Sequence, residues 1–241
     1  SDYLIWVITS IRHMVLPDDA VPVLNEGFIR LVDVMGDDNS VVRAARVSYG
    51  EESKGDSKDQ RLVNYMMEHD HGTPFEHINF TFHIKCPLFV ARQWMRHRIG
   101  SFNEISGRYV KLSDSCYYPD AWRANVNPRN KQDSTSHDWG HDHDLIEELF
   151  NDHIEKSLTT YHKLLEFGVA REQARTVLPL ATYTEFYWTV NARSLFNFIR
   201  LRISPDAQKE IRDYAEVLLE IGEETAPWSF AAFKRKYLTT S

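Results

Sequence analysis

Residues 78–84 read Ile-Asn-Phe-Thr-Phe-His-Ile, and this stretch decides the predicted fold. Its four apolar residues alternate with Asn79, Thr81 and His83. Successive side chains of a β-strand point to opposite faces of a sheet, so the alternation predicts a strand with one face on the core. Burial on one face is typical of antiparallel sheets. We therefore expect an antiparallel sheet built around residues 78–84.

Helix and strand patterns follow one another irregularly on both sides of this stretch. Further strands are predicted at 28–35 and at 182–190, the second from its Thr, Tyr, Phe and Trp content. Helices are predicted at 41–47, 57–68, 87–100, 142–166, 170–178, 192–201 and 205–224. This order lacks the strict strand–helix alternation of a doubly wound sheet. We expect an α+β fold, an antiparallel sheet flanked by helices with one long helix segment.

Polar residues predict where several elements begin and end. Asp37 and Asn39 can begin the helix after the first strand, and Asn191 can cap the helix after the last strand. Residues 101–107 are expected to form a loop after Gly100. Residues 112–140 are rich in Pro, Asn, Asp and Ser, which predicts a long polar surface insertion.

Composition places the chain among globular proteins. Its 241 residues are 42% hydrophobic and 26% charged, with a net charge of −7. We expect one domain over residues 1–241. The acidic balance argues against a general nucleic-acid binder, and no apolar run approaches the length of a membrane helix.

Two cysteines, Cys86 and Cys116, are too few for a disulfide framework. A reducing cytoplasm is therefore the expected compartment. Neither thiol has an evident histidine partner in the sequence. We expect both to be structural, because a reactive thiol needs an activating environment.

Residues 96–109 read Arg-His-Arg-Ile-Gly-Ser-Phe-Asn-Glu-Ile-Ser-Gly-Arg-Tyr and hold four Arg or His residues against one acid. Arginine binds phosphate and carboxylate with paired hydrogen bonds, so this window predicts a site for an anionic ligand with several groups. No glycine-rich phosphate loop of the dinucleotide-binding or P-loop type occurs. Side chains, rather than the backbone N–H groups of such a loop, must then bind any phosphate. The candidates are Arg96, Arg98, Arg108, Arg175, Arg193 and Arg202.

The predicted helix at 87–100 places three polar residues on one face. Gln93, Arg96 and His97 fall at positions i, i+3 and i+4. The amide of Gln93 suits a base edge, and Arg96 suits a phosphate or carbonyl. A solvated helix face would show the same spacing. The Ser-, Asn- and Arg-rich segment that follows favours a binding face.

Other features suggest different chemistry. His137-Asp138 and the run 141–144 could bind a divalent metal, although Asp is also normal where a surface helix begins. His69-Asp70 resembles the His-Asp pair of metal-dependent phosphohydrolases, but those enzymes are all-helical. The Arg-His-Arg segment could also serve a regulatory anion- or RNA-binding module. Ser106 could be a nucleophile, but no adjacent base is evident, so hydrogen bonding to a ligand is the preferred interpretation.

The window 96–109 matches in full the signature R-H-R-x-x-S-x-N-x-x-S-x-R-Y of flavin-dependent thymidylate synthases, and the chain resembles that family over about residues 28–228. Seven further stretches resemble it in order. They are 28–33, 42–48, 71–77, 80–83, 91–94, 174–179 and 189–195.

The resemblance implies a cytoplasmic flavoenzyme that makes dTMP from dUMP. In such enzymes methylenetetrahydrofolate donates the carbon, and FAD reduced by NADPH supplies the hydride. They use no cysteine nucleophile. The resemblance also implies a homotetramer whose active sites are each built from several subunits. No metal, nucleic-acid or membrane partner is implied.

The resemblance assigns roles residue by residue. The dUMP pocket is matched by Gln93, Arg96, Glu104, Ser106, Gly107, Arg108, Arg175 and Arg202. The FAD contacts are matched by Thr73, Arg96, His97, Arg98, Glu104, Asn191, Arg193 and Asn197. Arg202 matches the residue that promotes ionisation of the uracil ring, and His71 matches a histidine near the flavin and the folate. Asp206 stands where many members carry histidine near the flavin ring, which predicts altered flavin stacking.

Overall fold

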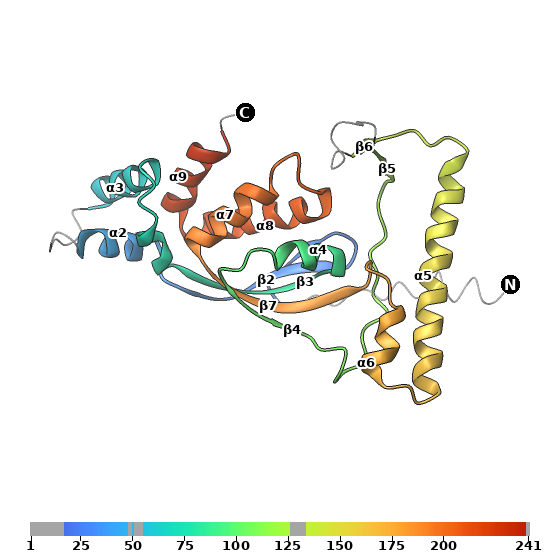
Figure 1. The fold of residues 1–241 in the computed structure, drawn as a ribbon. Helices are drawn as coiled ribbons and strands as arrows, with labels where there is room; N and C mark the ends of the chain where they lie inside the picture. The colour runs from blue at the N-terminus through green and yellow to red at the C-terminus, as the bar shows by residue number, and fades with distance from the viewer. Residues whose placement is uncertain (1–16, 48–49, 51–54, 126–133, 240–241) are drawn as a thin grey trace.

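A five-stranded antiparallel sheet lies at the centre of the protein (Figure 1). The computed structural model describes residues 17–47, 50, 55–125 and 134–239. The strands of this sheet are β1 (Ala20–Val23), β2 (Gly27–Met35), β3 (Asn79–Pro87), β4 (Ser101–Glu104) and β7 (Tyr183–Asn191). Their order across the sheet is β1-β2-β3-β7-β4. The predicted strands at 28–35 and 182–190 are thus confirmed as β2 and β7.

Strand β3 carries the predicted alternation. Phe80, Phe82 and Ile84 are fully buried, and the residues between them are only partly buried. The strand runs three residues beyond the predicted end, because its pairing with β7 continues as far as Pro87 opposite Tyr183. Pairing with a partner strand, which local alternation cannot show, sets this end of β3.

Helices cover one face of the sheet. Figure 1 shows α4 (Leu88–Trp94), α7 (Ala192–Arg202) and α8 (Lys209–Thr225) on the same side of it. No described helix lies over the other face in this view. That face carries polar contacts between strands: the hydroxyl groups of Thr81 and Thr189 form a hydrogen bond of 2.9 Å. The α+β class and the antiparallel sheet are confirmed.

Two further groups of helices lie at opposite ends of the sheet in Figure 1. One end holds α2 (Asp38–Arg46), α3 (Asp56–Glu68), the short 3₁₀ helix η2 (Thr73–His77) and α9 (Pro227–Tyr237). The other end holds α5 (Asp142–Glu166), α6 (Arg171–Ala174) and the 3₁₀ turn η3 (Arg175–Val177). The long helix α5 has its predicted bounds.

Two helix starts follow the predicted cap chemistry. Asp37 caps α2, because its carboxylate accepts from the Ser40 N–H at 3.0 Å and the Ser40 hydroxyl contacts the Asp37 N–H in return. Asn191 caps α7, because its Oδ1 accepts from the Ser194 N–H at 2.9 Å. Asn39 lies inside α2 rather than at its cap.

The predicted helix at 87–100 is wrong in its second half. Helix α4 ends at Trp94, and Arg202 Nη2 donates to the Gln93 carbonyl oxygen at 2.9 Å. In a continued helix that carbonyl would accept from the N–H of residue 97. The His97 N–H bonds Trp94 instead, as in a tight final turn. Gln93, Arg96 and His97 therefore do not share a helix face.

The segments at 101–107 and 112–140 also differ from their predictions. Residues 101–104 form edge strand β4, because Ser101 to Glu104 pair with β7. The segment 112–140 contains a small hairpin of β5 (Arg123–Ala124) and β6 (Thr135–Ser136). It is not wholly a surface insertion, because Cys116 and Tyr117 are buried beside Tyr183. Residues 126–133 of this prediction lie outside the described residues.

Several remaining bounds needed correction. The helix expected at 170–178 is divided into α6 and η3, and α8 begins at Lys209 rather than at residue 205. Strand β1, η2 and helix α9 were not predicted at all. Helix α9 is instructive because Asp38 caps it: the carboxylate accepts from the Trp228 and Ser229 N–H groups at 2.8 and 2.9 Å. A cap from 190 residues away leaves no local signal.

Candidate active site

A cavity of about 800 Å³ opens between α7 and the segment that follows α4; we call it the arginine cavity. Its lining consists of Glu76, Arg96, His97, Arg98, Ile99, Asn191, Arg193, Ser194, Asn197, Leu201 and Arg202. Four guanidinium groups stand against one carboxylate, and that carboxylate, on Glu76, accepts from Arg193 at 2.6 Å. The lining is therefore cationic and suits a ligand with more than one phosphate.

Arg202 is held by two hydrogen bonds at the base of this cavity. Its Nε donates to His97 Nε2 at 3.0 Å, and its Nη2 donates to the Gln93 carbonyl. Burial, with the nearby Arg202 charge, lowers the pKa of His97 to about 4. His97 is therefore neutral at pH 7, and its Nε2 accepts the hydrogen bond from Arg202 Nε. Burial, with the nearby Arg96 charge, also lowers the pKa of Arg202.

Stability should depend on pH through His97. The pKa of His97 is about 4 in the folded protein and 6.5 ordinarily. Between these pH values the unfolded chain therefore binds a proton at His97, whereas the folded chain does not. The resulting contribution to stability is present above pH 6.5 and is lost as the pH falls through about 4. Between these values the free energy of unfolding should rise more steeply with pH for the unaltered protein than for His97→Gln. Urea unfolding of both proteins at several pH values measures this, and parallel profiles would contradict it.

A second cavity, of about 940 Å³, shares two arginines with the first; we call it the Gln93 cavity. Arg96 and Arg202 line both cavities. Gln93 lines the second, where its amide donates to the Gln208 side chain at 2.6 Å. Asp206 also lines it and is exposed. The positive charges of Arg96 and Arg202 thus lie at the boundary between the two cavities, where both can contact a ligand in either one.

The wall of the Gln93 cavity includes the polar segment whose purpose the sequence leaves open. Tyr117, Trp122 and Arg123 contribute to this wall. Arg123 donates twice to the buried Glu210 carboxylate, at 2.7 and 3.0 Å, and the Tyr117 hydroxyl donates to it at 2.8 Å. Burial, together with the hydrogen bond to the Glu210 carboxylate, raises the pKa of Tyr117. The segment is therefore tied to α8 beside the cavity.

Other predicted residues gather in a separate cluster around Gly107. A Cβ at buried Gly107 would meet Leu112 at 2.9 Å and Arg175 at 3.1 Å, so Arg175 packs directly on this backbone. Arg108 pairs with Glu172 at 3.3 Å in an exposed bridge. Neither arginine lines the arginine cavity or the Gln93 cavity. Figure 1 places α6 beside α5, apart from α7.

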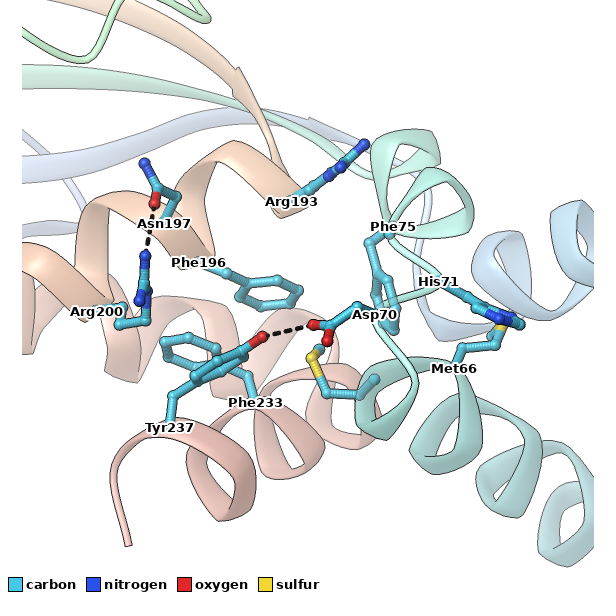
Figure 2. A pocket seen from close by; sticks show the side chains of 12 residues that line it. Met66, Asp70, His71, Phe75, Arg193, Phe196, Asn197, Arg200, Phe233 and Tyr237 are labelled. Atoms are coloured by element: carbon cyan, nitrogen blue, oxygen red, sulfur yellow. Dashed lines mark hydrogen bonds between the residues drawn. The ribbon is translucent and has the colours of Figure 1, made fainter. Parts of the chain in front are cut away.

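The remaining predicted residues lie outside both of these cavities. Glu104, on the edge strand, accepts from the Thr184 hydroxyl at 2.7 Å. Ser106 accepts from the Arg108 N–H at 3.3 Å. Thr73 is exposed at the start of η2. His71 lines a smaller third cavity, which Asn197 also lines (Figure 2).

Asn191 offers a matched pair of variants, because its two amide atoms do different things. Oδ1 caps α7, which leaves the Nδ2 donor to face the arginine cavity. Asn191→Ala should cost about 1 kcal/mol of stability and should also weaken the flavin binding that the family resemblance implies for this cavity. Asn191→Asp retains a capping oxygen, so it should keep the stability and lose only flavin affinity. Urea unfolding and flavin absorbance measure the two effects, and equal flavin content in all three proteins would refute the ligand role.

Sequence reasoning missed some residues of the site. Glu76 is the acidic residue in the lining of the arginine cavity. Its position inside the stretch 71–77, which resembles the family, could have identified it as a candidate. Arg123 and Glu210 gave no signal, because their partnership joins positions 87 residues apart. Such a pair is visible only in the folded chain.

Both cysteines are structural, as expected. Cys86 and Cys116 are 0% and 1% exposed. Burial raises the pKa of Cys86 well above its usual value and that of Cys116 to about 11. Both thiols therefore stay protonated at neutral pH, and a thiol without its thiolate is a poor nucleophile.

The rival features have ordinary surroundings. His137, Asp138 and residues 141–144 are all exposed. Within the described part of the chain, no group of three or more His, Cys, Asp or Glu side chains is placed to hold a metal ion. His69 contacts the Tyr65 carbonyl, and Asp70 pairs with Lys236. None of the described helices combines the length and apolar character that a bilayer crossing requires.

The fold and these cavities define a class: an α+β protein whose arginine side chains line a cationic cavity suited to an anionic ligand. The family model described as "Thymidylate synthase complementing protein" matches residues 30–228. Flavin-dependent thymidylate synthases from Thermosipho melanesiensis and Thermus thermophilus are 54% and 49% identical to this chain. The alignments cover 88% and 90% of this chain, and 92% and 79% of those relatives. The chain belongs to this family of flavin-dependent thymidylate synthases.

Solved structures agree with the family assignment. A UMP/dUMP methylase, PolB from Streptomyces cacaoi, bound with 5-Br dUMP, has a TM-score of 0.80 and 34% sequence identity to this chain. The match covers 89% of this chain and 97% of that one. The same methylase bound with 5-Br UMP has a TM-score of 0.79.

Proposed function

We propose that this protein converts dUMP to dTMP by reductive methylation, with methylenetetrahydrofolate as carbon donor and NADPH as reductant of FAD. The observation that carries the proposal is the pair of cavities that share Arg96 and Arg202. Together they offer a place for two phosphate-bearing ligands side by side. The relatives are named flavin-dependent thymidylate synthases, and the solved neighbour, a UMP/dUMP methylase, was bound with 5-Br dUMP.

The arginine cavity suits FAD by its donor set. Arg96, Arg98 and Arg193 can meet the two phosphates, and His97 and Asn197 add polar contacts. Asn191, which lines this cavity, and Thr73 and Glu104, which lie outside it in this chain, complete the proposed flavin contacts. When bound, FAD supplies the hydride that the reduction needs. The neutral His97 adds no positive charge there, because its pKa is far below 7.

The Gln93 cavity suits dUMP. Gln93 can bond the edge of the uracil ring, and Arg202 can stabilise negative charge that develops on that ring. A donor already held by His97 and the Gln93 carbonyl needs little reorganisation when charge develops. The proposed contacts from the Gly107 cluster are Ser106, Gly107, Arg108 and Arg175, with Glu104 adjoining, and two guanidinium groups there suit the dUMP phosphate.

We further propose that a homotetramer completes the site. Arg108 and Arg175 line neither cavity of their own chain, so another subunit is needed to bring them to Arg202. Two surfaces support assembly: the uncovered face of the sheet (Figure 1), and α5, where Leu145 and Leu149 are 54% and 63% exposed. One domain per chain and a cytoplasmic location complete the proposal.

An absorption spectrum tests the function first. The purified protein should show bound flavin, whose bands should shift when dUMP is added. With NADPH and methylenetetrahydrofolate it should form dTMP. A colourless protein that takes up no FAD, or one that forms no dTMP, would refute the proposal.

Mixed oligomers test the shared site. Arg175→Ala and Arg202→Ala should each be nearly inactive alone. When the two chains are unfolded together and reassembled, some sites receive both arginines from different subunits, so activity should return. A mixture as inactive as its components would place both arginines in a site of one chain.

A further inference from the structure

Gln208 has no role in the proposed reaction, yet it holds the side chain of Gln93. The Gln93 Nε2 donates to Gln208 Oε1 at 2.6 Å, and both residues line the Gln93 cavity. An amide group carries two N–H donors and an oxygen with two lone pairs. The bond to Gln208 uses one of the two donors of Gln93. The carbonyl oxygen and the second N–H of Gln93 are therefore left for a ligand.

The backbone that carries Gln208 is fixed on both sides. Arg212 Nη2 donates to the carbonyl oxygens of Pro205 and Ala207, at 2.9 Å in each case, and the Arg212 N–H donates to the Gln208 carbonyl at 3.1 Å. Two residues further along, the side chain of Glu210 is buried in its ion pair. The start of α8 thus holds the Gln208 side chain beside the cavity.

The backbone of Gln93 is fixed as well, because its carbonyl oxygen accepts from Arg202 at 2.9 Å. Gln93 can then exchange the groups that it offers to a ligand only by turning its side-chain amide over, which swaps the positions of oxygen and nitrogen. The two orientations have nearly the same shape, so packing alone does not choose between them. The oxygen of Gln208 does choose, because it accepts from the nitrogen of Gln93 and would repel its oxygen.

Uracil and cytosine differ in the order of donor and acceptor along the edge formed by N3 and the group on C4. Uracil has an N3–H donor next to the O4 acceptor, whereas cytosine has an N3 acceptor next to the N4 amino donor. An amide held in one orientation presents its oxygen and its N–H in one order. It can pair with only one of these two edges, whereas an amide that turns freely can pair with either.

We propose that Gln208 is a specificity-determining residue: it fixes the amide of Gln93 in the orientation that accepts a uracil nucleotide and rejects the corresponding cytosine nucleotide. Gln208 acts through Gln93 and is therefore a positioning residue. This inference rests on the proposed function, in which Gln93 bonds the edge of the uracil ring. The bond between the two side chains limits the effect. Losing one hydrogen bond of this kind changes an equilibrium constant roughly fivefold.

Gln208→Leu tests the proposal, because leucine has a similar size and offers no acceptor. Calorimetric titration of the FAD-loaded protein with dUMP and with dCMP gives both dissociation constants without turnover. The unaltered protein should bind dUMP more tightly than dCMP. In Gln208→Leu the ratio of the dCMP Kd to the dUMP Kd should fall roughly fivefold. A merely structural role would weaken the binding of both nucleotides alike and would leave this ratio unchanged.

Two further variants serve as controls. Gln208→Glu keeps the acceptor, since a carboxylate can only accept hydrogen bonds. Its negative charge should weaken the binding of both nucleotides to the same extent, and the ratio should stay that of the unaltered protein. Gln60 is exposed on α3 and does not line the Gln93 cavity. Gln60→Leu should therefore leave both dissociation constants unchanged.

Three results would overturn the proposal. They are an unchanged ratio in Gln208→Leu, equal affinity of the unaltered protein for dUMP and dCMP, and a ratio that falls as far in Gln208→Glu as in Gln208→Leu. The last result would show that the acceptor at this position does not set the preference. An unaltered protein that binds neither nucleotide would mean instead that the proposed function itself had failed.

Discussion

Arg202→Ala is expected to lower turnover about 100-fold or more, the cost of removing a preorganised donor that stabilises developing charge. Arg202 lines both large cavities, as Arg96 does, and is in addition fixed in place by hydrogen bonds to His97 and to the Gln93 carbonyl. Flavin should remain bound, because Arg96, Arg98 and Arg193 still line the flavin cavity. The measurements are kcat and flavin absorbance on the same preparation.

Arg202→Lys separates charge from geometry. Lysine keeps the positive charge, but a single ammonium group cannot reproduce the two directed bonds of the guanidinium. The variant should therefore recover only part of the lost turnover. Near-normal turnover in Arg202→Ala, with thermal unfolding unchanged, would remove Arg202 from the mechanism.

Glu210→Ala should cost about 3 kcal/mol of stability, because removing one partner of a buried ion pair leaves the other without compensation. The Glu210 side chain is 3% exposed, and its carboxylate accepts from both Arg123 and Tyr117. The change should also loosen the wall of the Gln93 cavity, so the KM for dUMP should rise. Urea unfolding and a dUMP titration measure the two effects.

The control for this prediction lies on the same helix. Glu220 is an exposed residue of α8, so Glu220→Ala should change stability by less than about 0.5 kcal/mol. Burial alone would raise the pKa of Glu210, but hydrogen bonds from Arg123 and Tyr117 lower it below its ordinary 4.5. The stabilising contribution is thus present above pH 4.5 and is lost as the pH falls further. Equal stability of the two variants would show that the buried pair contributes nothing.

Local patterns predicted those parts of the fold that depend on near neighbours. The alternation in 78–84 predicted β3, because one buried sheet face imposes a period of two. Asn191 was predicted as a cap because its partner, Ser194, is three residues away. The long helix α5 matched its predicted bounds for the same reason: apolar spacing over many turns is a local signal.

Helix ends set by distant residues could not be predicted. Arg202 bonds the Gln93 carbonyl, 109 residues away, where α4 ends. The edge strand β4 is short and polar, so only its pairing with β7 identifies it. The polar segment before α5 was expected at the surface, yet Cys116 and Tyr117 are buried by contacts with distant residues.

The sequence by itself determined the family, the antiparallel sheet and the candidate arginines for an anionic ligand, since residue type and near spacing carry that information. Only the tertiary structure decided how those arginines are grouped. It places Arg96 and Arg202 between two cavities and leaves Arg108 and Arg175 in a separate cluster. The physical reason is that side chains far apart in the chain are brought together by packing of the whole core, which no local pattern encodes.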